Sequence, residues 1–184
     1  MFIFNPLKYY DSHMTDTPDL SNLILRDAIS DDIPKLAYLH LVTWNATYPD
    51  EPKNPGLQTR ELQWKKSFET EPDWFCYVIE NEAGDLVGFA KGRKERDGTG
   101  NLNKLFLMEA YQSHGLGTRL IRQVALRFYN EGIKSMWVVA DMGNPTFVFY
   151  EKMGGVRKGD TDPEVAVYEW SDVSTLIKSP VTSP

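Results

Sequence analysis

The segment Leu105–Leu120 reads L-F-L-M-E-A-Y-Q-S-H-G-L-G-T-R-L. An apolar run, a turn with two glycines and the start of an amphipathic stretch follow one another, so the segment predicts a strand, a loop and a helix. Gly115 and Gly117 let the backbone come close to a ligand. The N–H groups of residues 113–118 would point outward from the helix N-terminus, where free donors and the helix dipole attract an anion. We therefore predict an anion site here, with a pyrophosphate as its natural ligand.

Two glycines alone would also fit a turn that only requires a positive φ. The segment lacks the Gly-Lys-Ser/Thr of the Walker phosphate loop. Leu120 stands where the dinucleotide-binding fingerprint has its third glycine. A nucleotide-binding oxidoreductase is therefore the weaker alternative, with Asp141 as the acidic ribose ligand expected ~20 residues further on.

Strand-like and helix-like stretches alternate around this segment. The turn signals Ala83-Gly84-Asp85 and Asp97-Gly98 separate three consecutive strands, which predicts an antiparallel meander. The order of elements predicts a mixed α/β fold with a central, mostly antiparallel mixed sheet flanked by about four helices. We expect strands at 23–28, 74–80, 86–93, 102–108, 135–140, 156–158 and 165–170, and helices at 30–44, 57–68, 117–131 and 145–153.

Length and composition limit the class of protein. The 184 residues fit one domain, which we place at 23–172 between an N-terminal arm (1–22) and a C-terminal tail (173–184). The net charge of −6 argues against a nucleic-acid partner and favours a cationic ligand. No apolar run is long enough to cross a membrane. One cysteine, Cys76, and three histidines predict no metal site and favour the reducing cytoplasm.

A second motif follows the loop Gln112-x-x-Gly115-x-Gly117 one strand later. It is N-P-T-F-V-F-Y-E-K-M-G-G at Asn144–Gly155. The two motifs in this order resemble the GNAT N-acyltransferase superfamily over about residues 23–170, in its bacterial branch that acetylates small molecules or peptides. The resemblance implies a single-domain GNAT fold, acetyl-CoA as co-substrate without a metal, and direct attack by the primary amine of a small molecule or peptide. It also allows a homodimer.

The resemblance further implies the roles of individual residues. The backbone of Leu105 and Leu107 would pair with the pantetheine arm, and the Leu107 N–H would stabilise the oxyanion. Asn144 would contact the CoA arm, and Tyr150 would protonate the departing thiolate, since a phenol with a pKa of ~10 suits a thiol. Asn144 as a helix N-cap and Tyr150 as a core residue are the alternatives. The pyrophosphate loop would comprise Gln112, Ser113, His114, Gly115, Leu116, Gly117 and Thr118.

The acceptor site and the general base are less defined. His40, Trp44 and Tyr48 share one helical face, where they either line an acceptor pocket that attracts an amine by cation–π contact or belong to the core. Asn101 and Asn103 stand where several family members carry a titrating residue. A water relay to Glu80, Asp97 or His40 is left open. A CoA-binding sensor without turnover is therefore the alternative from another class.

Overall fold

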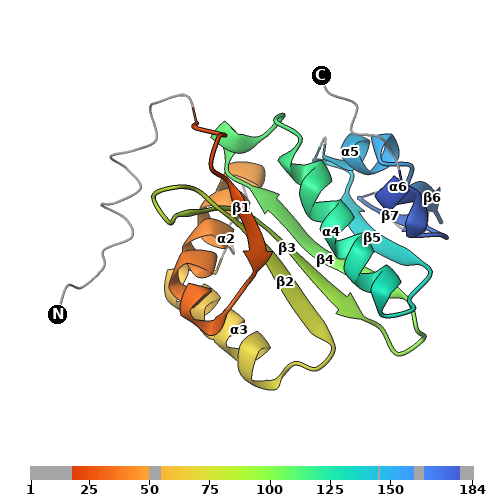
Figure 1. The fold of residues 1–184 in the computed structure, drawn as a ribbon, viewed down its shortest axis with the longest axis horizontal. Helices are drawn as coiled ribbons and strands as arrows, with labels where there is room; N and C mark the ends of the chain where they lie inside the picture. Colours follow the sequence, from red (N-terminus) through yellow and green to blue (C-terminus); the bar gives the residue numbers. More distant parts are fainter. Residues whose placement is uncertain (1–17, 50–54, 145, 160–163, 179–184) are drawn as a thin grey trace.

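The computed structural model describes residues 18–49, 55–144, 146–159 and 164–178 (Figure 1). Seven strands form one sheet in the order β1-β2-β3-β4-β5-β7-β6, in which only β4 and β5 pair in parallel. This confirms the predicted mixed, mostly antiparallel sheet. The strands are β1 Ile24–Asp27, β2 Trp74–Glu80, β3 Leu86–Lys94, β4 Gly100–Leu107, β5 Met136–Asp141, β6 Val156–Lys158 and β7 Val165–Trp170.

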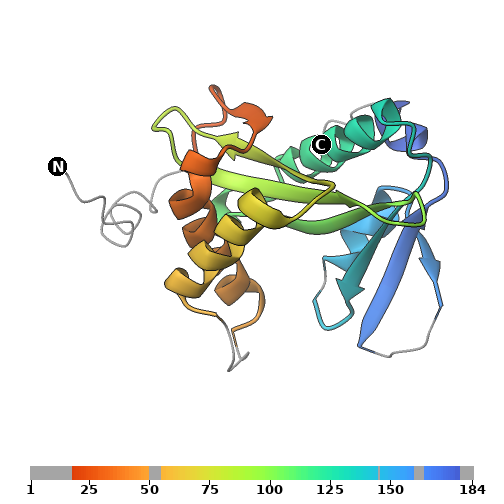
Figure 2. The ribbon, with the colours of Figure 1, turned by 90° about the horizontal axis from the view of Figure 1, so that it is seen from below.

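Helices cover both faces of the meander. Figure 2 shows α2 and α3 against one face of β2–β4 and α4 against the other. The helices are η1 Ser30–Asp32, α2 Ile33–Thr47, α3 Leu57–Thr70, η2 Glu109–Tyr111, α4 Leu116–Asn130, α5 Phe147–Lys152 and α6 Ser174–Lys178. The described residues thus hold five α-helices, one more than the four expected ranges, and the additional helix is α6.

The long helix α4 forms where its sequence is most strongly amphipathic. Its apolar side is fully buried against the sheet, and Gly100 of β4 leaves room for Phe128, whose ring would lie 2.6 Å from a Cβ at that position. Gly132, with φ at +77°, ends the helix, and the N–H of Ile133 returns to the Phe128 carbonyl at 2.9 Å. The helix start, which carries the predicted anion loop, is therefore fixed by the core.

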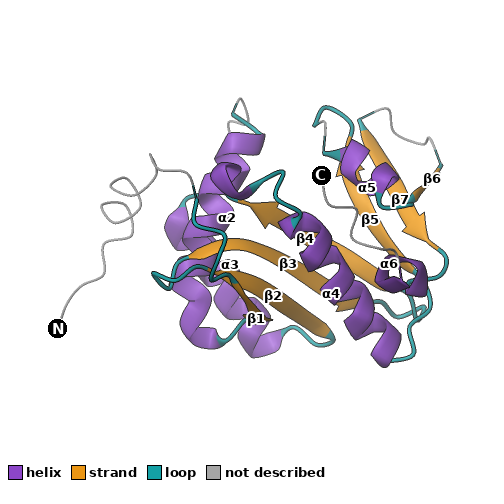
Figure 3. Ribbon diagram, turned by 45° about the horizontal axis from the view of Figure 1, so that its top comes forward, coloured by secondary structure: helices purple, strands orange, loops and turns teal. Residues whose placement is uncertain are grey.

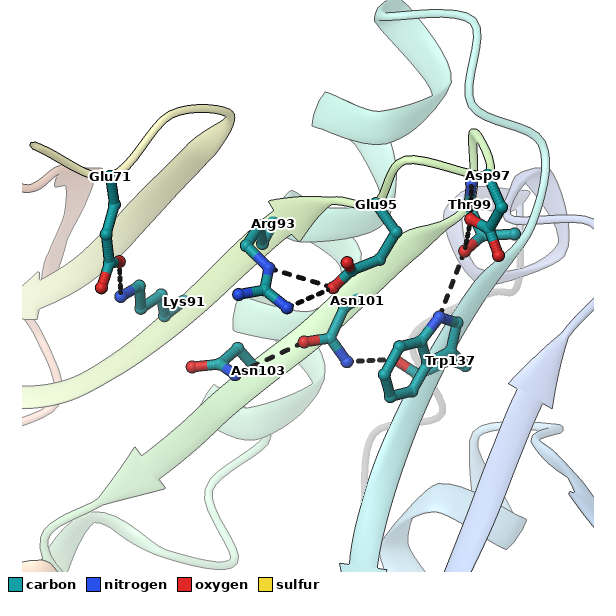
Figure 4. A network of polar contacts seen from close by, with 9 residues as sticks. All are labelled: Glu71, Lys91, Arg93, Glu95, Asp97, Thr99, Asn101, Asn103 and Trp137. Carbon is teal, nitrogen blue, oxygen red and sulfur yellow. Dashed lines mark hydrogen bonds and ion pairs between the residues drawn. The ribbon is translucent and has the colours of Figure 1, made fainter. Parts of the chain in front are cut away.

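The parallel pair β4–β5 is very short. The two strands pair only at Gly100 with Met136 and at Asn101 with Trp137. Long hydrogen bonds support this junction: Asn101 Nδ2 donates to the Trp137 carbonyl at 3.5 Å, and Trp137 Nε1 donates to Thr99 Oγ1 at 3.2 Å (Figure 4). Beyond the junction the strands separate, as Figure 2 shows, which leaves one edge of β4 without a neighbouring strand.

The structure describes both ends of the chain only in part. Residues 1–17 of the expected arm and 179–184 of the expected tail lie outside the described residues. Within the range expected as tail, Val173 and Leu176 are buried, and α6 packs on α4 (Figure 3). No helix of the described part is long and apolar enough to cross a membrane. The boundary at residue 172 stays a prediction. The sequence did not predict α6, because its five residues are too few to show a periodic pattern.

A polar cluster fixes β1 to the rest of the sheet. The Arg26 guanidinium donates to both carboxylate oxygens of Asp32 at 2.7 and 2.8 Å and to Glu80 at 2.7 Å. Asp32 also accepts the N–H of Ile29 at 2.9 Å. Burial opposes ionisation of Asp32, but the hydrogen bonds and charge of Arg26 outweigh it, so the pKa of Asp32 is lowered. This cluster joins β1, η1 and β2.

We expect Arg26→Met to lower the free energy of unfolding by about 2 kcal/mol, because it leaves two partly buried carboxylates unpaired. The measurement is urea unfolding at pH 7. Since the lowered pKa of Asp32 stabilises the fold above the unfolded value of about 4, the loss shrinks as the pH falls below it. Glu69→Gln, which removes the exposed pair with Lys65, is the control and changes stability by less than about 0.5 kcal/mol. Equal losses would contradict the assignment.

Candidate active site

A cleft of about 770 Å³ lies between β4, β5 and α5, and we call it the β4–β5 cleft. Nine of the eleven predicted cofactor-binding residues line it: Leu105, Leu107, Gln112, Ser113, Gly115, Gly117, Thr118, Asn144 and Tyr150. The other two, His114 and Leu116, do not line it. The Leu116 side chain is buried in the core instead, so only its backbone could serve a ligand.

The exposed edge of β4 directs specific backbone groups into this cleft. Met108 donates its N–H to the Val87 carbonyl at 2.9 Å, beside the Leu107–Gly88 pair. Because residues of an antiparallel pair alternate between facing the partner strand and facing away, the N–H and C=O groups of Leu105 and Leu107 point away from β3. These groups point to the β5 side of β4, but β5 pairs with β4 only at Gly100 and Asn101 and does not reach them. This is the orientation that an extended ligand needs in order to pair with β4.

Gln112 occupies one of these groups. Its side-chain amide donates to the Leu107 carbonyl at 3.1 Å. The predicted loop residue therefore holds the end of β4, and the N–H of Leu107 is left as the donor that faces the cleft. Such a fixed N–H suits the oxygen of a carbonyl that gains negative charge.

The loop before α4 presents a row of free donors. No described residue accepts a hydrogen bond from the backbone N–H of residues 113–118. Ser113 and Gly115 adopt left-handed conformations, with φ at +63° and +75°. The loop thus turns these N–H groups outward at the positive end of a 15-residue helix. Such an arrangement of donors is suited to a phosphate group.

Tyr150 enters the cleft from α5. Its hydroxyl has no hydrogen-bond partner among the described residues. Burial, with a smaller contribution from Tyr48, raises the pKa of Tyr150 to about 12. The phenol is therefore protonated at neutral pH, and it can donate a hydrogen bond to a ligand in the cleft.

The motif around Tyr150 positions α5 on the last strands. Glu151 accepts a hydrogen bond from the Tyr168 hydroxyl at 2.8 Å, and the Met153 carbonyl accepts one from Trp170 Nε1 at 2.9 Å. Gly155 leaves space for the Trp170 ring, which would lie 2.9 Å from a Cβ. The residues E-K-M-G-G thus fix the helix that carries Tyr150.

Tyr48, Asp141 and Asn144 all line the cleft, and the Tyr48 hydroxyl interacts with the other two side chains. Burial raises the pKa of the Tyr48 phenol, the charge of Asp141 raises it further, and a hydrogen bond with Asn144 opposes both. Asn144 also accepts the Thr146 N–H at 3.0 Å, but Thr146 is the N-cap of α5, so the expectation of Asn144 as the helix N-cap is wrong, because the helix begins later than expected. Asp141 is the one acidic side chain among the described residues that line the cleft. No local pattern in the sequence indicates this grouping, because Tyr48 lies 93 positions before Asp141 in the chain.

A second cavity, of about 430 Å³, lies between α3 and strands β3 and β4, and we call it the α3 pocket. Trp44, Asn103 and Lys104 line both cavities, so the two adjoin. His40 lines the α3 pocket, whereas Tyr48 lines the cleft. The three residues predicted on one helical face are therefore divided between two cavities, with Trp44 at their junction.

Two side chains of the protein already contact the Trp44 ring. The Arg60 guanidinium carbon stands 4.9 Å from the centre of the Trp44 ring, and the Tyr48 ring lies 4.7 Å away. The cation–π contact expected for an amine acceptor is thus made by a side chain of the protein.

The three predicted relay candidates lie in different places. Glu80 is bonded to Arg26 at the β1 side of the sheet, and Asp97 accepts hydrogen bonds from Thr99 in the turn before β4. Neither lines a cavity described here. Only His40 does, and burial lowers its pKa to about 2, with the charges of Arg60, Lys104 and Lys91 adding to the effect. His40 is therefore neutral and a poor proton acceptor.

Metal ligands do not gather in the part of the chain that the structure describes: no three His, Cys, Asp or Glu side chains stand together there. Asn101 and Asn103 bond to each other at 3.4 Å (Figure 4).

Comparison with known proteins gives one family. Residues 35–155 match the model of the Acetyltransferase (GNAT) family. The uncharacterized N-acetyltransferase YuaI of Bacillus subtilis (strain 168) is 28% identical over 169 residues, which cover 83% of this chain and 95% of that protein.

Solved structures agree with the fold. PaiA N-acetyltransferase from Thermoplasma acidophilum, crystallised in complex with coenzyme A, superposes with a TM-score of 0.65 at 19% identity, over 80% of this chain and 98% of its own. A chimera of spermidine N-acetyltransferase SpeG from Vibrio cholerae and hSSAT gives a TM-score of 0.66 at 16% identity, over 86% and 100%.

We expect the His40 imidazole to remain neutral between pH 5 and 8, because its pKa lies far below the usual value of 6.5. The measurement is ¹H–¹⁵N NMR of the ring nitrogens, with His40→Gln to assign the signals. The unfolded chain binds a proton near pH 6.5 that the folded chain does not, so this residue makes stability fall as the pH drops below that value. A His40 titration midpoint above pH 5 would contradict the burial argument.

Proposed function

Because the chain belongs to the GNAT acetyltransferase family, we propose that it transfers the acetyl group of acetyl-CoA to a primary amine of a small molecule or peptide. The amine attacks directly while both substrates are bound. The alignment of three features in one cleft carries this proposal: the free donors of the loop, the open edge of β4, and the unpartnered Tyr150 hydroxyl. Acetyl transfer by this route needs all three, whereas the oxidoreductase alternative uses only the loop.

The chain's own groups suit acetyl-CoA as co-substrate. The N–H groups of residues 113–118 would hold the pyrophosphate, and the outward N–H and C=O of Leu105 would pair with the pantetheine arm, which leaves the Leu107 N–H for the thioester oxygen. Binding both substrates in one cleft makes the attack effectively intramolecular. The thioester supplies the acyl group and a thiolate leaving group.

The transfer needs an oxyanion donor, a partner for the leaving thiolate and a route for the proton of the amine. We assign the Leu107 N–H to the oxyanion. Tyr150, protonated with a pKa of about 12, donates a hydrogen bond to the thiolate, although the raised pKa makes full proton transfer less favourable than a phenol of ordinary pKa would. Asp141, with the Tyr48 hydroxyl beside it, is the carboxylate that can take the amine proton from within the cleft.

We expect Tyr150→Phe to lower kcat by about 100-fold and to leave the Kd for acetyl-CoA within about threefold, because the lost hydrogen bond matters most when the thiolate forms. Stopped assays with a thiol reagent give kcat, and calorimetry gives Kd. Tyr129→Phe, on the exposed face of α4, is the control. An unchanged kcat would refute the assignment. Binding of acetyl-CoA without turnover on any primary amine would favour the sensor alternative instead.

The loop can be tested with two matched glycines. Gly115 and Gly98 both have positive φ, and a Cβ on either meets no atom within 4 Å. Gly115→Ala and Gly98→Ala should therefore lose similar stability, about 1 kcal/mol. Only Gly115→Ala should weaken acetyl-CoA binding, by about tenfold or more, because its Cβ stands where the phosphates approach. Calorimetry and thermal unfolding measure the two effects. Equal acetyl-CoA affinity in both variants would remove the loop from the site.

A further inference from the structure

The lining of the α3 pocket is strongly cationic. Five basic side chains and a single carboxylate, that of Glu71, line it. The basic residues are Arg60, Lys66, Lys91, Arg93 and Lys104. A cavity with this excess of positive charge beside the proposed acyl-transfer cleft favours a second substrate that carries a negative charge.

Two of the basic residues already have carboxylate partners. Lys91 pairs with Glu71 at 2.7 Å, and Arg93 pairs with Glu95 at 2.7 Å (Figure 4). Lys104 makes no ion pair or hydrogen bond with any described residue. Burial lowers the pKa of Lys104 to about 8, and the charges of Lys91 and Arg60 lower it further, against a weaker opposing effect of Glu71. The positive charge at the junction of the two cavities is thus not neutralised by the described part of the chain.

Buried polar atoms in the same lining also lack partners. Trp44 Nε1, Trp64 Nε1 and both ring nitrogens of His40 are buried without a hydrogen bond to any described residue. His40 is only 1% exposed and Trp64 only 3%. An indole N–H can only donate, and buried donors are nearly always satisfied in folded proteins. A hydrogen-bond acceptor in the α3 pocket would give these indole N–H groups the partner that they lack.

These observations select the chemical class of the acceptor. Resting on the acetyl transfer proposed above, we propose that the acceptor is a primary amine that also carries a carboxylate or phosphate group, and that the α3 pocket binds this group. Lys104 and Arg60 supply the charge, and two indole N–H groups that lack a partner belong to residues of the same lining. The amine then lies in the β4–β5 cleft, near Leu107 and Asp141, because the cavities adjoin at Trp44 and Lys104.

A polyamine fits this arrangement poorly. Its second ammonium group would enter a cavity beside Lys104 and Arg60, where like charges repel and partial burial strengthens the repulsion. The net charge of −6 led to the expectation of a cationic ligand, but the local charge around the pocket has the opposite sign. Because the substrate contacts the pocket and not the whole surface, the local positive charge determines which ligand charge is favoured.

The test compares amines that differ only in the anionic group. The pairs are 4-aminobutyrate with butylamine, and phosphoethanolamine with ethanolamine, and spermidine serves as the polycation. Coenzyme A release gives kcat/KM for each. We expect at least one anionic member to exceed its neutral partner by about 10- to 100-fold, as charge-assisted hydrogen bonds predict, and to exceed spermidine. The preferred pair distinguishes a carboxylate from a phosphate.

Lys104→Met links the preference to the pocket. It should reduce the ratio of kcat/KM within the preferred pair by about tenfold, mainly through KM. Lys65→Met is the matched control, since Lys65 lies on the exposed side of α3 and lines neither cavity. It should leave the ratio unchanged. Acetyl transfer that favours spermidine or the neutral amines, with no effect of Lys104→Met on the ratio, would overturn the inference while the proposed function stands.

A binding measurement separates failure of the inference from failure of the proposed function. With coenzyme A present, titration of the carboxylate and phosphate amines should change the tryptophan fluorescence, and the change should be lost in Lys104→Met and kept in Lys65→Met. If no amine is acetylated but this binding is observed, the pocket inference stands and the transferase proposal fails. If the anionic amines neither bind nor react, the pocket inference fails.

Discussion

The early separation of β4 from β5 is the constraint on which the rest of the site depends. The two strands pair at only two positions and then part. Backbone N–H and C=O groups that no neighbouring strand satisfies need another partner. The register with β3 turns the N–H and C=O groups of Leu105 and the N–H of Leu107 toward the gap, so the sheet itself supplies a binding edge for an extended ligand. The loop before α4 and the hydroxyl of Tyr150 lie along the same gap, and they are useful there only because the gap exists.

Local signals in the sequence predicted most of the fold. The hairpin turns, the glycine that ends α4 and the apolar period of that helix each depend on residues close together in the chain, so the meander and the loop could be read directly. The helix α6 could not, because five residues give no period and its stability comes from Val173 and Leu176 packing into the core. The roles of Leu105, Leu107 and Tyr150 came from the resemblance, and their geometry came from the structure.

The acceptor side was harder to predict for a physical reason. The α3 pocket combines α3 with β3 and β4, and its charges belong to elements that are up to 44 residues apart, from Arg60 to Lys104. No single stretch shows a basic cluster. In the sequence Lys91 and Arg93 look like solvated strand residues, yet Lys91 is 7% exposed and stands 4.8 Å from the Trp74 ring centre. For Asp141 the sequence suggests only the role of a ribose ligand, since nothing local to it indicates that Tyr48 is its neighbour.

Trp44 shows why the two hypotheses for the aromatic face were incomplete. As a core residue it would need its indole N–H satisfied by the protein, and in the described residues it is not. As a cage for an ammonium group it would need a free ring face, and Arg60 and Tyr48 already contact the ring. What remains is the indole N–H, which has no partner among the described residues. An unpartnered N–H in a lining that also holds Lys104 favours an acceptor atom over an ammonium group, so Trp44 supports the proposed anionic group. The orientation of the second substrate follows: its amine toward the β4 edge, its anionic group toward α3.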